Sequence, residues 1–151
     1  MENAKKQLKT YSIVVLILAA FSVVRSILQV ILTDYDKLYL DALVKDPATT
    51  KAIVTAGAII TVVVSLILVL PQVFVGYRGM KVAKNPDSKK GFIVWAWILL
   101  VLAGIGVISG IVSLVNSSDI LGTITSIADA LLDAVIFFCV IHYAKIVQKG
   151  A

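Results

Sequence analysis

Residues 91–115 read GFIVWAWILLVLAGIGVISGIVSLV, a run of 25 residues without a charged side chain. Each residue of an α-helix rises about 1.5 Å, so about 20 apolar residues cross the roughly 30 Å hydrocarbon core of a bilayer. The run is therefore long enough and apolar enough to cross a membrane as one helix. Three further stretches meet the same requirement, at residues 11–33, 52–77 and 120–144.

The composition of the whole chain agrees with this interpretation. Of its 151 residues 60% are hydrophobic and 15% are charged, whereas soluble domains contain about 45–50% apolar and about 25% charged residues. A single cysteine excludes a disulfide scaffold, and the short alternating segments of a membrane β-barrel are absent from the sequence. We therefore expect an all-α integral membrane protein, an antiparallel four-helix bundle forming one transmembrane domain over residues 1–151 with an outer loop at 34–51.

The first apolar stretch follows three lysines, as a secretory signal peptide would. The apolar region of a signal peptide is about 7–15 residues long and ends at a small-residue cleavage site. Here the stretch runs through Arg25 to Thr33 without such a site, so we expect a retained helix. In the second stretch, Asp46-Pro47 is predicted to begin the helix and Pro71 to kink it.

Basic residues near the span ends predict the orientation, because they are retained on the cytoplasmic side. Three segments that share one side of the membrane carry ten basic residues, and the other side carries three. The ten are Lys5, Lys6, Lys9, Arg78, Lys81, Lys84, Lys89, Lys90, Lys145 and Lys149, and the three are Lys37, Lys45 and Lys51. A multi-pass protein of the cell membrane with both termini in the cytoplasm is predicted.

Ionisable residues inside the predicted spans are the most informative feature, because each costs about 2.5–3.5 kcal/mol to insert. Arg25 and Gln29 lie four residues apart in the first span, and Asp129 and Asp133 four apart in the fourth. Spacing of four places both members of each pair on one helix face. Arg25 and Asp129 fall at matching depths of about 12–14 Å from the outer ends, so we expect them to pair.

Asp133 lies one turn deeper than Asp129. Two carboxylates on adjacent turns in a medium of low dielectric oppose each other's ionisation, so one is expected to keep a proton, and Asp133 is the better candidate. Hydroxyl groups of Thr61 and Ser65 lie at comparable depth in the second span. Two interpretations stay open: a proton or cation site within the bundle, or a structural ion pair beside a neutral acid.

Small residues at a spacing of four predict the faces on which helices pack, because lipid-embedded helices associate by close backbone approach. One such face occurs in each of the second, third and fourth spans. Their members are Gly57, Thr61 and Ser65 in the second span, Gly106 and Gly110 in the third, and Gly122, Ser126, Ala130 and Ala134 in the fourth. The spacing does not decide between packing within one chain and packing between copies.

No cofactor, metal or catalytic set is predicted. Cys139 and His142, the only residues of their types, cannot complete a tetrahedral zinc site, and no third group supports them as a nucleophile pair. The basic joint at residues 78–90 is explained by topology, although it could also hold anionic lipid headgroups. Nucleic-acid binding is not expected, because the joint has no element that could read a groove or stack on bases.

The sequence Gly76-Tyr77-Arg78-Gly79-Met80-Lys81-Val82-Ala83-Lys84-Asn85-Pro86-Asp87-Ser88 resembles the joint between the second and third spans of small, uncharacterised bacterial four-helix membrane proteins. The resemblance implies the cytoplasmic membrane of a bacterium and no activity. We therefore expect a non-enzymatic structural or accessory subunit whose partners are the lipid bilayer and another membrane protein or a second copy. The alternative is a minimal transporter or channel component that uses Arg25, Asp129 and Asp133.

Overall fold

The computed structural model describes residues 2–32, 47–86, 91–116 and 120–150. Inside its helices, the side chains of residues 29, 30, 32, 47–52, 54, 58, 61 and 116 lie outside the description. Most of the predicted outer loop, residues 34–46, lies outside the described residues.

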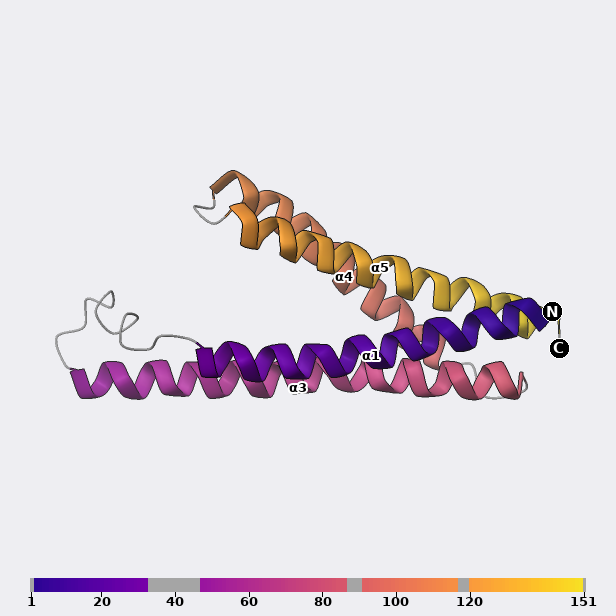
Figure 1. Ribbon diagram of the computed structural model, residues 1–151, viewed down its shortest axis with the longest axis horizontal. Helices are drawn as coiled ribbons and strands as arrows, with labels where there is room; N and C mark the ends of the chain where they lie inside the picture. Colours follow the sequence, from indigo (N-terminus) through magenta and orange to yellow (C-terminus); the bar gives the residue numbers. More distant parts are fainter. Residues whose placement is uncertain (1, 33–46, 87–90, 117–119, 151) are drawn as a thin grey trace. The chain divides into compact units, whose positions relative to one another are not determined.

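Four long helices make up the described chain: α1 (Glu2–Leu32), α3 (Pro47–Lys84), α4 (Phe92–Asn116) and α5 (Ile120–Lys149) (Figure 1). Each contains a segment of 24 to 30 residues that is long and apolar enough to cross a membrane. The prediction of an all-α fold with four potential membrane spans is therefore confirmed.

The helices extend beyond the predicted spans at their polar ends. α1 begins at Glu2, α3 begins at Pro47 and ends at Lys84, and α5 ends at Lys149. Hydropathy marks where lipid contact is favourable, whereas a helix continues into water until its backbone is interrupted. Residues 78–84 of the predicted joint therefore belong to α3. Residues 47–51 belong to it as well, and the helix start at Pro47 agrees with the prediction that Asp46-Pro47 begins this helix.

The chain divides into two compact units, and the division crosses α1 and α3. The first unit contains Met1–Ile17 and Pro71–Ala151, and the second contains Leu18–Leu70. α3 is helical on both sides of Pro71, where the second unit gives way to the first. The kink at Pro71 and the single transmembrane domain stay predictions.

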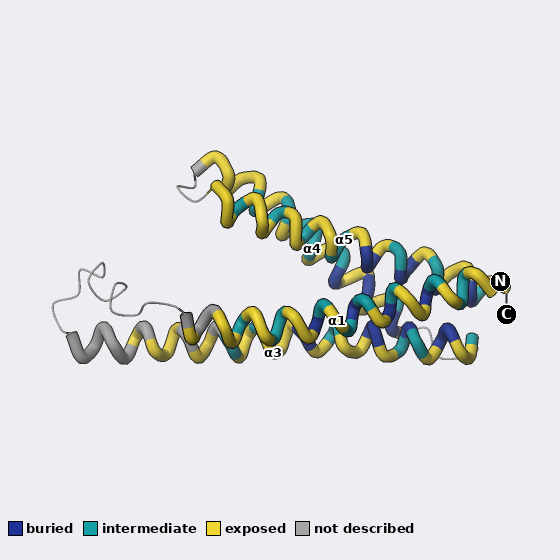
Figure 2. The backbone as a smooth tube through the Cα atoms, viewed as in Figure 1, coloured by how far each residue is buried: buried dark blue, intermediate teal, exposed yellow. Residues whose placement is uncertain are grey.

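The side-chain core lies almost entirely in the first unit, as the dark blue segments of Figure 2 show. It is built from the N-terminal part of α1, the C-terminal part of α3, the start of α4 and the C-terminal half of α5. Its buried apolar residues are Leu8, Val15, Val75, Val82, Ala83, Phe92, Ala96, Leu99, Ile136, Phe137, Val140, Ile141, Ala144 and Val147. In the second unit, the described side chains that are buried are Ala19 and Val69.

Two glycines of α3 let α1 approach closely. A Cβ added at Gly76 would lie 2.7 Å from Leu16 Cγ and 2.9 Å from the Ser12 carbonyl oxygen. A Cβ added at Gly79 would lie 3.2 Å from Ser12 Cβ and 3.9 Å from Leu8 Cδ1. Higher residue numbers on α1 thus meet lower numbers on α3, so these two segments run in opposite directions. Ser12 is fully buried in this contact.

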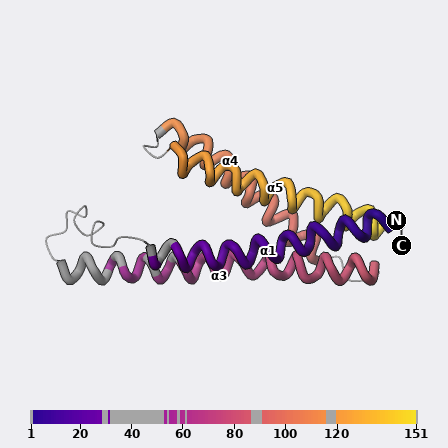
Figure 3. The backbone as a smooth tube through the Cα atoms, viewed as in Figure 1, coloured from indigo at the N-terminus to yellow at the C-terminus, as the bar shows by residue number. Residues whose placement is uncertain are grey.

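α4 and α5 lie side by side along their lengths (Figure 3). A Cβ added at Gly106 would lie 3.5 Å from the Ala130 Cβ, and one added at Gly110 would lie 2.5 Å from Ile127 Cγ1. α4 and α5 therefore also run in opposite directions. None of the described side chains between residues 100 and 135 on these helices is buried, which suits segments whose outer surface is covered by lipid.

Candidate functional site

Two carboxylates on α5 form the centre of the candidate site. Asp129 is exposed and Asp133 is half-buried. Asp133 lies one turn closer to the buried half of α5, which begins at Ile136. At 100° per residue, Ser126, Asp129 and Asp133 share one face of α5. Ile127 and Ala130, which contact the glycines of α4, lie on the neighbouring face. α4 therefore supports the acidic face from beside it and does not cover it.

The hydroxyl groups next to the acids donate hydrogen bonds within their own helix. Ser126 Oγ donates to the Gly122 carbonyl oxygen at 3.0 Å, and Thr125 Oγ1 donates to the Leu121 carbonyl oxygen at 2.9 Å. This arrangement satisfies a hydroxyl in an apolar medium without a partner helix. The Ser126 and Thr125 hydroxyl protons are thus already engaged, while their oxygens keep acceptor capacity.

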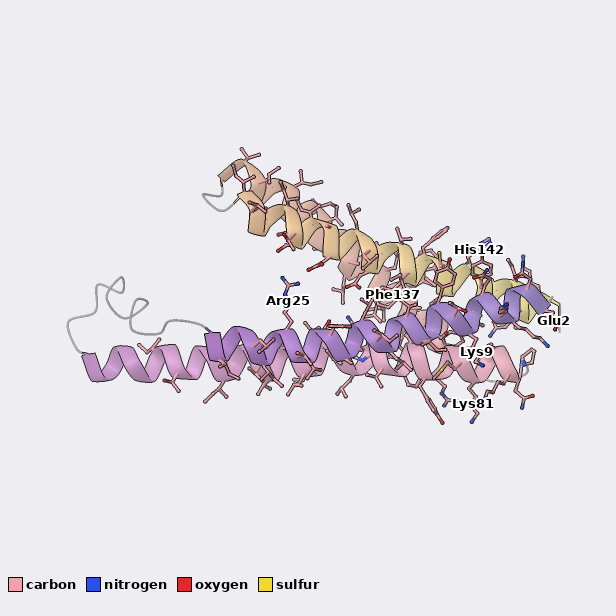
Figure 4. The ribbon with its side chains drawn as sticks, in the orientation of Figure 1. Glu2, Lys9, Arg25, Lys81, Phe137 and His142 are labelled. Carbon is pink, nitrogen blue, oxygen red and sulfur yellow. The ribbon has the colours of Figure 1, made fainter. Side chains whose placement is uncertain are left out.

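The predicted counterpart of the acids belongs to the other unit. Arg25 lies exposed on the part of α1 that belongs to the second unit (Figure 4), whereas Asp129 and Asp133 belong to the first. Gln29 is helical, but its side chain lies outside the description. The pairing of Arg25 with Asp129 stays a prediction.

The remaining predicted site residues lie on α3 in the second unit. Ser65 is half-buried, and the side chain of Thr61 lies outside the description. A Cβ added at Gly57 would meet nothing within 4 Å. The packing role predicted for these three residues stays a prediction.

The predicted inner end of α5 carries an aromatic cluster. The rings of Tyr11 and Tyr143 stack with centroids 5.6 Å apart, and His142 lies 6.2 Å from the Phe138 ring and 5.3 Å from the Tyr143 ring. The Lys145 ammonium lies 5.3 Å from the Trp97 ring centroid, a cation–π contact. His142 is therefore engaged by aromatic rings, and among the described residues no group of three or more His, Cys, Asp or Glu could hold a metal ion.

The close approach of α1 and α3 at Gly76, Gly79 and Ser12 was not predicted. Gly76 falls in the predicted second span and Gly79 in the predicted joint, and neither was predicted to pack against another helix. The signal that could have identified the contact is the spacing itself, since Gly76 and Gly79 lie three residues apart and share one helix face.

Comparison with protein-family models, curated proteins and solved structures finds no match to this chain. The fold and the candidate site define the chain as an all-helical protein with four helices suited to crossing a membrane. Its role is therefore argued from its own residues.

Proposed function

We propose that this chain is a non-enzymatic, multi-pass protein of a bacterial cytoplasmic membrane that serves as a structural or accessory subunit. Its four helices form an antiparallel bundle with both termini in the cytoplasm. The excess of basic residues at the termini and at residues 78–90 supports this orientation. The partner is another membrane protein or a second copy of the chain.

The observation that carries the proposal is the exposed acidic face of α5. Asp129 is exposed and Asp133 half-buried on a helix with the length and hydropathy of a membrane span. Facing lipid would cost each ionised carboxylate about 2.5–3.5 kcal/mol, so this face favours cover by protein over cover by acyl chains. α4 contacts Ile127 and Ala130 beside this face, so the protein that covers the acids is not α4.

Photo-crosslinking along α5 tests the proposal. A photoreactive residue at Ser126, on the acidic face, is compared with one at Val135, which is 58% exposed on the opposite side of the helix. We expect crosslinks to a second chain from position 126 and to lipid alone from position 135. Crosslinks to lipid alone from both positions would contradict the proposal. A crosslink from position 126 confined to the chain's own α1 would remove this face as a subunit interface.

The spacing of Asp129 and Asp133 favours a second candidate function, a proton-coupled transporter or channel component. Two acids on adjacent turns can pass or share a proton where water reaches them. Flux measured in proteoliposomes that contain the Asp133→Asn variant separates the two functions. Loss of a pH-dependent flux with folding retained supports transport, and an unchanged flux supports the subunit role.

The structural pairing of Arg25 with Asp129 has its own test. If the two residues pair, Asp129→Asn alone destabilises the protein and Arg25→Gln in the same chain restores much of the loss, because no charge within the spans is then left without its counter-charge. Independent, additive effects of the two substitutions would show that the residues do not interact.

A further inference from the structure

A pocket of about 300 Å³ lies between the start of α1 and the end of α3, wholly within the first unit. Its lining residues are Lys9 of α1 and Tyr77, Met80, Lys81 and Lys84 of α3. Figure 4 labels Lys9 and Lys81 on the two helices. The pocket therefore brings together lysines that lie more than 70 residues apart in the sequence.

The charge of this pocket is one-sided. Three of its five described lining residues are lysines, and none of the five is acidic. Lys9, Lys81 and Lys84 are all exposed, so their ammonium groups are accessible to a ligand from outside. An ammonium group is a compact point charge that binds phosphate well, so a pocket lined by three lysines suits an anionic ligand.

Exposed apolar side chains lie one helical turn from two of the lining residues, Lys9 and Tyr77. Ile13, four residues after Lys9, is 38% exposed, and Val73, four residues before Tyr77, is 42% exposed. Because these segments of α1 and α3 run in opposite directions, both residues lie one turn further into the predicted spans. A ligand that fits the whole surface has an anionic head and an apolar tail.

We propose that this pocket binds the phosphate headgroup of an anionic phospholipid, with an acyl chain lying along Ile13 and Val73. The inference rests on the membrane location proposed above and is independent of any subunit partner. Tyr77 is 58% exposed at the pocket, as befits a ring at the membrane interface, where its apolar body and its hydroxyl meet lipid and water.

The retention of basic residues on the cytoplasmic side explains how many basic residues lie near these helix ends. It does not explain why three lysines line one pocket. The neighbouring Arg78 does not line it and lies instead over the Phe74 ring, 5.6 Å from its centroid. Lys145 lies over the Trp97 ring and is not among the described residues that line the pocket. Lys145→Gln is therefore the matched control, because it removes the same charge from the same unit at a residue that does not line the pocket.

The test is lipid binding to the full chain purified in detergent, measured by native mass spectrometry with phosphatidylglycerol and phosphatidylcholine as probes. We expect preferential retention of phosphatidylglycerol. Retention should weaken about fivefold in each of the variants Lys9→Gln, Lys81→Gln and Lys84→Gln. The reason is that a basic residue near an anionic lipid surface contributes about 1 kcal/mol, which is a factor of about five in affinity. Lys145→Gln should change it less than twofold. Circular dichroism checks that each variant keeps its helices.

Three results would overturn the lipid site. Equal retention of phosphatidylcholine would show that the headgroup charge is not recognised. A loss with Lys145→Gln as large as with Lys81→Gln would show a diffuse charge effect. Displacement of the lipid by inorganic phosphate would assign the pocket to a free phosphate compound instead. A chain that stays in solution without detergent would refute the proposed membrane location, a failure distinct from these three.

Discussion

Gly76→Ala tests the contact between α1 and α3 on which the core of the first unit depends. The added Cβ would lie 2.7 Å from Leu16 Cγ and 2.9 Å from the Ser12 carbonyl oxygen, whereas carbon atoms in contact normally lie about 3.5–4.0 Å apart. The Leu16 side chain can rotate, but the carbonyl oxygen is held by its helix. α1 must therefore move away from α3.

The magnitude follows from two opposing effects. Overpacking of this kind costs about 1–3 kcal/mol, and replacing a helical glycine by alanine returns about 0.5–1 kcal/mol. Taken at the middle of each range, the net loss of unfolding free energy is about 1 kcal/mol, which lowers the midpoint of thermal unfolding by about 2–4 °C. Cys139, the only cysteine of the chain, is half-buried in the same unit, and its reaction with a thiol-specific dye reports the unfolding.

Gly104→Ala is the matched control, because a Cβ at position 104 would meet nothing within 4 Å. It should leave the midpoint unchanged or raise it slightly. If Gly76→Ala unfolds at the same temperature as Gly104→Ala, or at a higher one, Gly76 does not pack closely against Leu16 and Ser12.

Two further predictions concern α4, α5 and the aromatic cluster. Gly110→Ala should lower the unfolding midpoint, because its Cβ would lie 2.5 Å from Ile127 Cγ1. Gly106→Ala should be tolerated, because its Cβ would make an ordinary 3.5 Å contact with the Ala130 Cβ. Equal effects of the two substitutions would contradict this register of α4 against α5. Tyr11→Leu and Tyr143→Leu in a double-mutant cycle should show a coupling of about 0.5–1.5 kcal/mol for the stacked rings, and additive losses would argue against the stack.

The number and type of helices could be predicted from the sequence because the physical signal is strong. A charge-free run such as residues 91–115 has few alternatives in a chain this apolar. The helix ends could not be predicted as well. Nothing in the hydropathy of Arg78 or Lys81 indicates that α3 continues through them to Lys84, because lipid contact and helix formation end for different reasons.

The candidate site could be predicted only as a set of residues on separate helices. Spacing places Asp129 and Asp133 on one face of α5, since that relation is local. The convergence of Lys9 with Lys81 and Lys84 is a relation between helices, which depends on the close approach that Gly76 and Gly79 allow. Sequence periodicity describes one helix at a time and does not contain such a relation.

Site-directed thiol labelling in bacterial cells tests most directly the claim that these helices cross a membrane, because α1 and α3 separate the three labelled positions. In a Cys139→Ser background, single cysteines replace Asn3, Lys37 or Asn85, and intact cells are treated with an impermeant maleimide. We expect labelling of Lys37→Cys in intact cells and of Asn3→Cys and Asn85→Cys only after the membrane is permeabilised. Equal labelling of all three positions in intact cells would contradict the proposed membrane topology.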